Sequence, residues 1–252
     1  MELRELEGLT ELAREAEGKK TFEVNGRTYF IDGRGDLEVV KETSVPQSPV
    51  TLHTLTGLLD YIVAENKSVP ISTEIAMPLV GARLRIDNPT TVYLEGSLDE
   101  YGRRPVHAIA KFQTPNFEFN NWYDQEKMNI SMQSSFVKTD DRDVILQVIG
   151  NLKESDVKQA SDDGVTQQVQ IKSGVASVAD VKVPNPVVLA PYRTFLEVAQ
   201  PESKFIFRMR SGMMSAIFEA DGGMWKIEAA ALIKQYLEDE LKKLELDLKV
   251  IA

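Results

Sequence analysis

The sequence predicts an α+β protein with a mainly antiparallel sheet, flanking helices and a long C-terminal helix. Segments rich in β-forming residues come in groups, over residues 21–40, 71–112 and 161–222, with few helical segments between them. Grouped strands favour antiparallel pairing, whereas strands that alternate with helices favour a parallel sheet. Apolar residues then recur at helical spacing over residues 224–246, which predicts the long C-terminal helix.

The N-terminal segment predicts a helix followed by a small sheet. Leucines and alanines at helical spacing among charged residues predict an amphipathic helix over residues 2–17. Asn25-Gly26 stands between the β-forming segments TFEV and RTYFI, and both residues tolerate the positive φ of a tight hairpin turn. A third short strand near residues 37–40 extends the predicted hairpin.

The proline-containing segment SVPQSPV, residues 44–50, predicts a break before the next elements. A helix is predicted over residues 52–66, with Thr51 as its N-terminal cap. Three strands follow it, at residues 79–86, 91–98 and 104–112.

The second half of the chain predicts two further helices, four strands and the final helix. The helices are expected at residues 123–136 and 140–151, and Thr139 or one of the two aspartates after it caps the second. The strands are expected at residues 165–172, 187–199, 204–210 and 213–219, and residues 155–164 are expected to form a mobile loop. No interdomain linker is evident, so we expect a single α+β domain over 1–252 with a possible helical insertion at 120–152.

Composition narrows the classes of function. The absence of cysteine excludes disulfides, thiolate zinc sites and cysteine nucleophiles, and is typical of a reducing cytoplasm. The N-terminus is charged from residue 2, and no apolar run reaches the length of a membrane span, so neither a signal peptide nor a membrane partner is expected. A net charge of −10 opposes the approach of nucleic acid, although a local basic surface can overcome it.

Motifs for catalysis and metal binding are weak. The two histidines, His53 and His107, are too few for a zinc site and are predicted to be structural or surface groups. The clusters DDRD (140–143) and DDG (162–164) contain carboxylates that suit a divalent cation, but they also suit a helix N-terminus and a turn. Asp221-Gly222-Gly223 could hold a phosphate, but a helix-initiating turn capped by Asp221 is favoured. We therefore assign no catalytic residue, cofactor or metal.

Basic residues are concentrated on the predicted strands and turns. Lys204, Arg208 and Arg210 share one parity on a strand, so one face of a sheet would carry all three, while Phe205 and Phe207 point to the other face. An aromatic cluster lies at residues 117–123, and basic sheet faces near aromatics suit single-stranded nucleic acid; a half-solvated sheet also carries such charges without a function. The candidate anion or nucleic-acid contacts are Arg83, Arg85, Arg103, Arg104, Lys204, Arg208 and Arg210.

Leucines at 4-3-4 spacing line one side of the C-terminal helix: Leu237, Leu241, Leu244 and Leu248. Such a seam packs either on its own domain or on the same helix of a second subunit. The spacing alone leaves both alternatives open.

Four segments, residues 53–62, 99–104, 132–169 and 183–226, carry a resemblance to a known family. With them, the chain resembles the YfdQ-like family of phage and prophage proteins over roughly residues 50–236, a family whose domain has no known function. The resemblance implies a phage or prophage gene that is expressed in a bacterial host cytoplasm. It assigns no functional residue.

Three hypotheses about function follow from the residues and the resemblance. The first is a non-enzymatic accessory protein that assembles with itself into a homo-oligomer, in a binding or structural role. The second is a replication or recombination accessory protein that contacts single-stranded DNA. The third is an enzyme or sequesterer of a nucleotide-like ligand. Helices at both chain ends and a strand-rich middle with edges to cover favour the first hypothesis.

Overall fold

The structure, a computed structural model, describes residues 21–24, 27–31, 37–39, 48–67, 79, 81–99, 102–151, 161–162, 167–173 and 177–252. Contacts divide the chain into two compact units, Met1–Gln47 and Ser48–Ala252, and each is described by itself. The boundary falls within the break predicted at residues 44–50. The expected single domain over 1–252, with a possible helical insertion at 120–152, stays a prediction.

The first unit contains a three-stranded antiparallel sheet. Its strands are β1 (Thr21–Val24), β2 (Arg27–Ile31) and β3 (Leu37–Val39), in the order β1-β2-β3. The register pairs Val24 with Arg27, so the two strands are joined across the two residues Asn25 and Gly26. The predicted hairpin and third strand are therefore confirmed. The helix expected at residues 2–17 lies outside the described residues.

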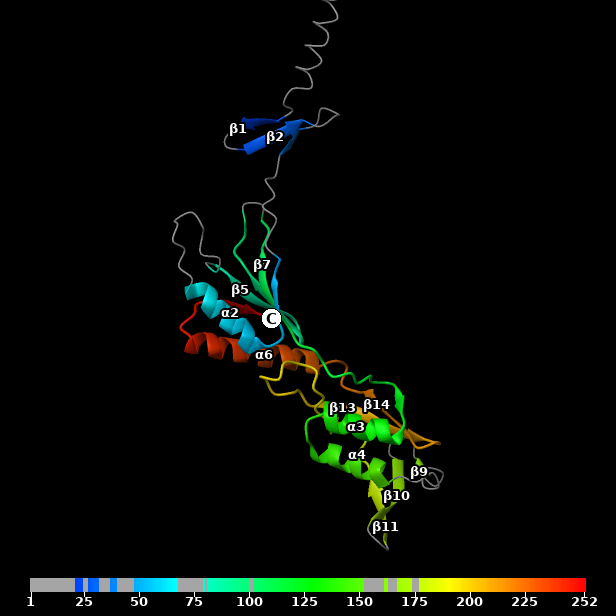
Figure 1. The fold of residues 1–252 in the computed structure, drawn as a ribbon. Helices are drawn as coiled ribbons and strands as arrows, with labels where there is room; N and C mark the ends of the chain where they lie inside the picture. Colours follow the sequence, from blue (N-terminus) through cyan, green and yellow to red (C-terminus); the bar gives the residue numbers. More distant parts are fainter. Residues whose placement is uncertain are drawn as a thin grey trace, which may run out of the picture. The chain divides into compact units, whose positions relative to one another are not determined.

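The second unit contains a five-stranded sheet in the order β15-β5-β6-β7-β4, which joins strands from both ends of the unit (Figure 1). Its central strands β5, β6 and β7 are antiparallel, and each edge strand runs parallel to its neighbour. The predicted strands at 79–86, 91–98 and 104–112 are confirmed with shorter bounds. In chain order the five strands are β4 (Val50–Leu52), β5 (Arg83–Asn88), β6 (Thr91–Glu95), β7 (Val106–Lys111) and β15 (Lys249–Ile251).

Two helices, α2 (Leu55–Lys67) and α6 (Trp225–Lys243), pack side by side on this sheet (Figure 1). Leu84 and Leu94 of the sheet, Leu58 of α2 and Leu237 of α6 are fully buried in one apolar core. Alternation along β5 places Arg83 and Arg85 on the opposite, part-exposed face. This division into an apolar and a polar face is typical of an antiparallel sheet with one solvated side.

The start of α2 differs from the prediction. Thr51 and Leu52 belong to β4, and the helix begins at Leu55 rather than at residue 52. The predicted cap Thr51 is therefore wrong: the hydroxyl of Thr54 accepts a hydrogen bond from the Gly57 N–H at 2.9 Å. The strand forms because β7 offers residues 50–52 a parallel partner, which local sequence does not reveal. Strand β15 was also missed, because its partner β5 is distant in sequence.

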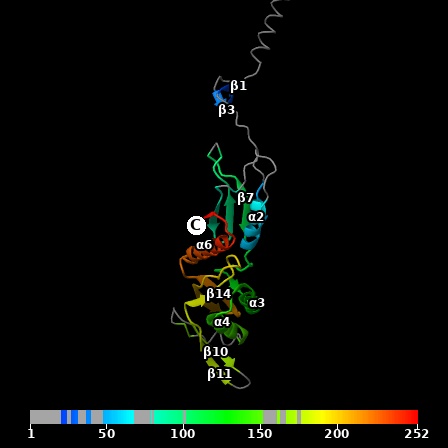
Figure 2. The same cartoon turned by 90° about the vertical axis from the view of Figure 1, so that its left-hand side faces the viewer.

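A second, four-stranded antiparallel sheet has the order β12-β13-β14-β8. Its strands are β8 (Trp122–Tyr123), β12 (Val187–Leu189), β13 (Ser203–Arg210) and β14 (Met214–Glu219). Helices α3 (Gln125–Ser135) and α4 (Asp140–Asn151) lie side by side and share its apolar core (Figure 2). The Thr139 hydroxyl accepts from the Arg142 N–H at 3.2 Å, which confirms Thr139 as the cap of α4.

A further antiparallel sheet contains β9 (Ser161–Asp162), β10 (Gln167–Ser173) and β11 (Ser177–Lys182), in the order β11-β10-β9. The strand predicted at 165–172 is confirmed as β10, and β11 was not predicted. Most of the loop expected at residues 155–164 lies outside the described residues.

The predicted strand at 187–199 is mostly wrong. Only Val187–Leu189 forms a strand, and residues 190–202 form a loop between β12 and β13. This loop buries Phe195 and Val198 in the core of the five-stranded sheet, and the Thr194 hydroxyl donates to the carbonyl of Pro89 at 2.6 Å. Apolar residues that face a distant core imitate the pattern of a strand.

The fold class is α+β, with sheets that are mainly antiparallel and a long C-terminal helix, as predicted. Leu237 and Leu241 of α6 are buried in the core of their own unit, so that part of the leucine seam packs within the chain. The helix ends at Lys243, not at residue 246, and Glu245 beyond it has a φ of 55°. None of the helices in the described ranges is both long and apolar enough to cross a membrane.

Candidate functional site

One face of the four-stranded sheet carries three of the seven basic residues that the sequence singled out. Along β13, Phe205, Phe207 and Met209 are buried, whereas Lys204 and Arg210 are exposed and Arg208 is partly exposed. The side chains of a strand alternate between the two faces of the sheet. The predicted parity of Lys204, Arg208 and Arg210, opposite to that of Phe205 and Phe207, is therefore confirmed.

Aromatic side chains from the neighbouring strands lie on the same face. Residues directly opposite each other in an antiparallel pair share one side of the sheet. Arg208 pairs with Ala216, which in turn pairs with Trp122, and Ile206 pairs with Phe218. We call the set Trp122, Lys204, Arg208, Arg210 and Phe218 the sheet face.

Trp122 is the centre of the contacts on the sheet face. The Arg210 guanidinium carbon lies 4.3 Å from the centroid of its ring, within cation–π distance. The Phe218 ring packs edge-on against it at a centroid distance of 6.0 Å. Both aromatic residues are partly exposed. The sheet face therefore combines exposed aromatic surface with positive charge.

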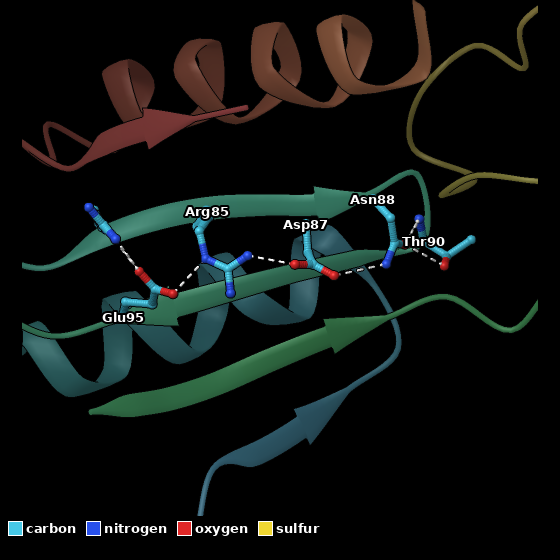
Figure 3. Close-up of polar contacts among 6 residues, drawn as sticks. Arg85, Asp87, Asn88, Thr90 and Glu95 are labelled. Carbon is cyan, nitrogen blue, oxygen red and sulfur yellow. Dashed lines mark hydrogen bonds and ion pairs between the residues drawn. The ribbon is translucent and has the colours of Figure 1, made fainter. Parts of the chain in front are cut away.

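Two of the remaining predicted contacts, Arg83 and Arg85, lie on the other sheet and pair with carboxylates there. Figure 3 shows the Arg85 Nε donating to the mostly buried Glu95, at 2.6 Å. The Arg83 Nε donates to the same carboxylate at 2.8 Å. Arg85 also donates to Asp87 Oδ1 at 2.6 Å. Burial raises the pKa of Glu95, but hydrogen bonds from Arg85 and Arg83 outweigh it, so the pKa lies below the ordinary value. This network holds β5 and β6 together.

Arg103 and Arg104 lie between β6 and β7, apart in the fold from the sheet face. Arg103 donates from Nε to Asp99 Oδ2 at 2.9 Å, and its backbone N–H donates to Asp99 Oδ1 at 2.8 Å. Arg104 donates to the Gly96 carbonyl at 2.7 Å. The seven predicted contact residues thus form no single patch, and only Lys204, Arg208 and Arg210 come together with aromatics.

A buried arginine that sequence reasoning missed marks a second site. Arg193, 6% exposed, extends from the loop at 190–202 and donates from Nη1 to Glu219 Oε1 at 3.0 Å and from Nη2 to the Ser203 hydroxyl. Its guanidinium carbon lies 4.0 Å from the centroid of the Trp225 ring. Burial lowers the pKa of Arg193 to about 10, partly offset by the charges of Glu219 and Asp221, so the side chain is cationic at neutral pH.

The Gln200 side chain fixes the backbone around Arg193. Its Oε1 accepts from the N–H groups of Arg193 and Thr194 at 3.0 and 3.2 Å, and its Nε2 donates to the Phe195 carbonyl at 3.0 Å. An irregular loop must find partners for its backbone polar groups, and one amide side chain here bonds five of them, including the carbonyls of Thr194 and Val198. Prolines at 191 and 201, on either side of the segment, were the available sequence signal that it is a loop.

A cavity of about 160 Å³ adjoins Arg193. We call it the Arg193 pocket. Rings from several elements form its walls, including Phe117 and Phe119, which form part of the aromatic cluster predicted at 117–123. Its lining residues are Thr114, Pro115, Phe117, Phe119, Ser135, Pro191, Tyr192, Arg193, Glu219 and Trp225.

Asp221 lies in the turn that initiates α6, as expected, but the N-cap position of the helix is Met224 rather than Asp221 and has no side-chain cap hydrogen bond. Its carboxylate accepts from the Gly223 N–H at 3.0 Å and from the Trp225 N–H at 3.4 Å. Burial raises the pKa of Asp221, but hydrogen bonds from Gly223, Ser203 and Trp225 outweigh it, so the pKa lies below its ordinary value. The backbone N–H groups that a phosphate would use are thus bound by Asp221.

Three of the other candidate ligands have structural partners: Asp141, Asp143 and His53. Asp141 accepts from the Val188 N–H at 2.6 Å, and Asp143 lies 3.7 Å from the Lys138 ammonium. The Nδ1 of His53 lies 3.2 Å from the Lys111 carbonyl. His107 is on β7, as expected. Among the described residues, no three histidine or acidic side chains are grouped as a metal site would require.

Comparison of the chain with family models, with curated proteins and with solved structures found no match. The resemblance to the YfdQ-like family therefore stays a prediction.

Proposed function

We propose that this protein binds single-stranded nucleic acid through the sheet face and catalyses no reaction. The observation that supports the proposal is the grouping of Trp122 and Phe218 with Lys204, Arg208 and Arg210 on one side of the four-stranded sheet. Proteins that bind single strands without sequence preference combine a basic track for the phosphates with aromatic rings for the bases. The described helices α3 and α4 share the core on the other side of this sheet.

The charges limit the strength of this contact. The whole chain carries −10, so long-range attraction to a phosphate backbone is absent and only the local cations favour binding. Three cations that neutralise three phosphates give a log–log salt slope of about −2 on a single strand. One base stacked on Trp122 adds about 1–3 kcal/mol. Binding should therefore be weak and strongly sensitive to salt.

Replacing Arg208 and Arg210 together with alanine should reduce the salt slope from about −2 to about −0.7, because one phosphate contact remains. The measurement is fluorescence anisotropy of a labelled oligothymidine between roughly 50 and 200 mM salt, the range over which phosphate contacts change affinity most. Since Arg210 is exposed and Arg208 only partly buried, the double variant should retain its circular dichroism spectrum.

The matched control replaces Lys138 and Lys242, both exposed and both away from the sheet face, with alanine. It removes the same two positive charges, so an effect of net charge alone would lower binding equally in both double variants. The proposal would be ruled out if both double variants lost oligothymidine binding equally, or if the wild-type protein did not bind at roughly 50 mM salt.

Self-assembly is a second candidate function, and a different surface favours it. Met224 and Ile227, three residues apart at the start of α6, are 71% and 74% exposed. Residues three apart on a helix are neighbours, so these two form one exposed apolar spot. The resemblance to phage and prophage proteins supports an accessory role in a bacterial cytoplasm. In that role, a homo-oligomer would present several sheet faces to one strand of nucleic acid.

We expect the purified protein to have a mass in solution that is a multiple of 28.2 kDa. Ile227→Glu should shift the mass toward that of the monomer, because a charge would be buried against an apolar partner. Light scattering measures the mass, and Gln235→Glu, which adds the same charge at another exposed position of α6, is the control. A wild-type mass of 28.2 kDa at micromolar concentration would contradict self-assembly.

A further inference from the structure

We propose that the Arg193 pocket binds a small planar heterocycle with hydrogen-bond acceptors at its edge, of the size of one nucleobase. The pocket is separate from the sheet face. Glu219 pairs directly opposite Phe205, whose side chain is in the core shared with α3 and α4. The pocket therefore opens on the helix-bearing side of the four-stranded sheet, and the inference does not depend on the proposed nucleic-acid contact.

The volume selects the size of the ligand. Pockets for drug-sized molecules measure about 300–1,000 Å³, whereas this cavity measures about 160 Å³. One water occupies about 30 Å³ of liquid, so the cavity has room for one ring system and not for a dinucleotide or a folded peptide. A nucleoside would place its base inside and its sugar outside.

The walls select the shape of the ligand. Phe117 stacks on Tyr123 at a centroid distance of 5.2 Å with an interplanar angle of 7°, and Phe119 stacks on Phe205 at 5.3 Å with an angle of 14°. These stacks leave ring surface of Phe117 and Phe119 in the cavity wall. Aromatic rings held rigidly by their neighbours favour a flat partner, because offset stacking and edge-to-face contacts depend on geometry.

Arg193 selects the chemistry of the ligand. Its Nη1 and Nη2 have partners, but its Nε is buried and has no hydrogen-bond acceptor in the described part of the chain. A buried donor without a partner costs about 1–3 kcal/mol. A ring carbonyl or ring nitrogen that reached this donor would remove the cost. Base edges are recognised in this way, by hydrogen bonds beside aromatic and guanidinium planes.

The chain has two tryptophans, Trp122 on the sheet face and Trp225 in the pocket wall, so each reports on one site. In the variant Trp122→Phe, the fluorescence of Trp225 should change saturably on titration with adenosine or uridine. We expect a dissociation constant below about 1 mM for at least one of the two nucleosides. Ribose 5-phosphate and inorganic phosphate should produce no change, because the ring supplies the contact.

Filling the pocket from its rim tests whether the nucleoside binds inside it. Thr114 lines the pocket and is exposed, so Thr114→Phe in the Trp122→Phe background should occupy the cavity without removing a core side chain. We expect at least a tenfold loss of nucleoside affinity. The control is Gln113→Phe, which adds the same ring at the adjacent exposed position outside the lining.

Three results would overturn the inference: no saturable signal with either nucleoside up to about 10 mM, an equal response to phosphate alone, or unchanged affinity in Thr114→Phe. The proposed nucleic-acid contact is tested separately. Thr114→Phe in the wild-type background should bind oligothymidine with unchanged affinity and salt slope, because Thr114 is not part of the sheet face.

Discussion

Replacing Phe205 with alanine is expected to lower the free energy of unfolding by about 3–5 kcal/mol. Phe205 has no exposed surface, stacks on Phe119 and lies 5.5 Å from the guanidinium of Arg193. The variant would lose the transfer free energy of the ring and leave a cavity in the core of the four-stranded sheet. Urea denaturation followed by circular dichroism measures the difference.

The control is Phe218→Ala, which removes the same ring from the sheet face. Phe218 lies on the adjacent strand β14 but on the other, part-exposed side of the sheet. Its replacement should therefore lower the free energy of unfolding by only about 1 kcal/mol. Equal losses for the two variants would mean that both faces of the sheet are buried in solution. The sheet face would then be an interface rather than a free binding surface.

Replacing Leu237 with alanine is expected to lower the free energy of unfolding by about 2–5 kcal/mol. Leu237 is fully buried between α6 and the five-stranded sheet, in the same core as Ile233 and Leu241. These three residues are spaced four apart and line one side of the helix, so each holds α6 on its own unit. Thermal and urea denaturation should report the same loss.

Leu244→Ala provides the control for the leucine seam, because Leu244 is 41% exposed. Leu244→Ala should lower the free energy of unfolding by no more than about 0.5 kcal/mol, as for an ordinary surface substitution. A large loss that depends on protein concentration would instead show that the C-terminal part of the seam packs on a second copy of the chain.

Local patterns predicted the elements whose partners are near in sequence. Asn25-Gly26 between two β-forming segments predicts the β1–β2 hairpin, because a two-residue turn also sets the register. Thr139 predicts the start of α4, because a cap bonds to the N–H of a residue three positions later. The parity of Lys204, Arg208 and Arg210 predicts their common face, because side chains alternate on any strand.

Elements that depend on distant partners were missed or misplaced. The short strands β4 and β15 are each three residues long and exist because β7 and β5 offer them an edge. Residues 190–202 resemble a strand, yet Phe195 and Val198 face another core. Arg83 and Arg85, two of the candidate anion contacts, both donate to Glu95 on the next strand, a pairing that local sequence does not reveal. Which residues become neighbours in these cases depends on how whole strands pair and pack, and short stretches of sequence do not specify that.

The sequence by itself determined the fold class, the faces of β13 and the lack of cysteine chemistry, since these depend on residue type and local spacing. Only the tertiary structure decided which charged side chains come together. It places Glu95 between two arginines, and it brings Arg193, Glu219 and Trp225 together from three separate segments. Burial, ion pairing and cavities depend on what surrounds a side chain in space, and spacing along the chain does not specify those neighbours.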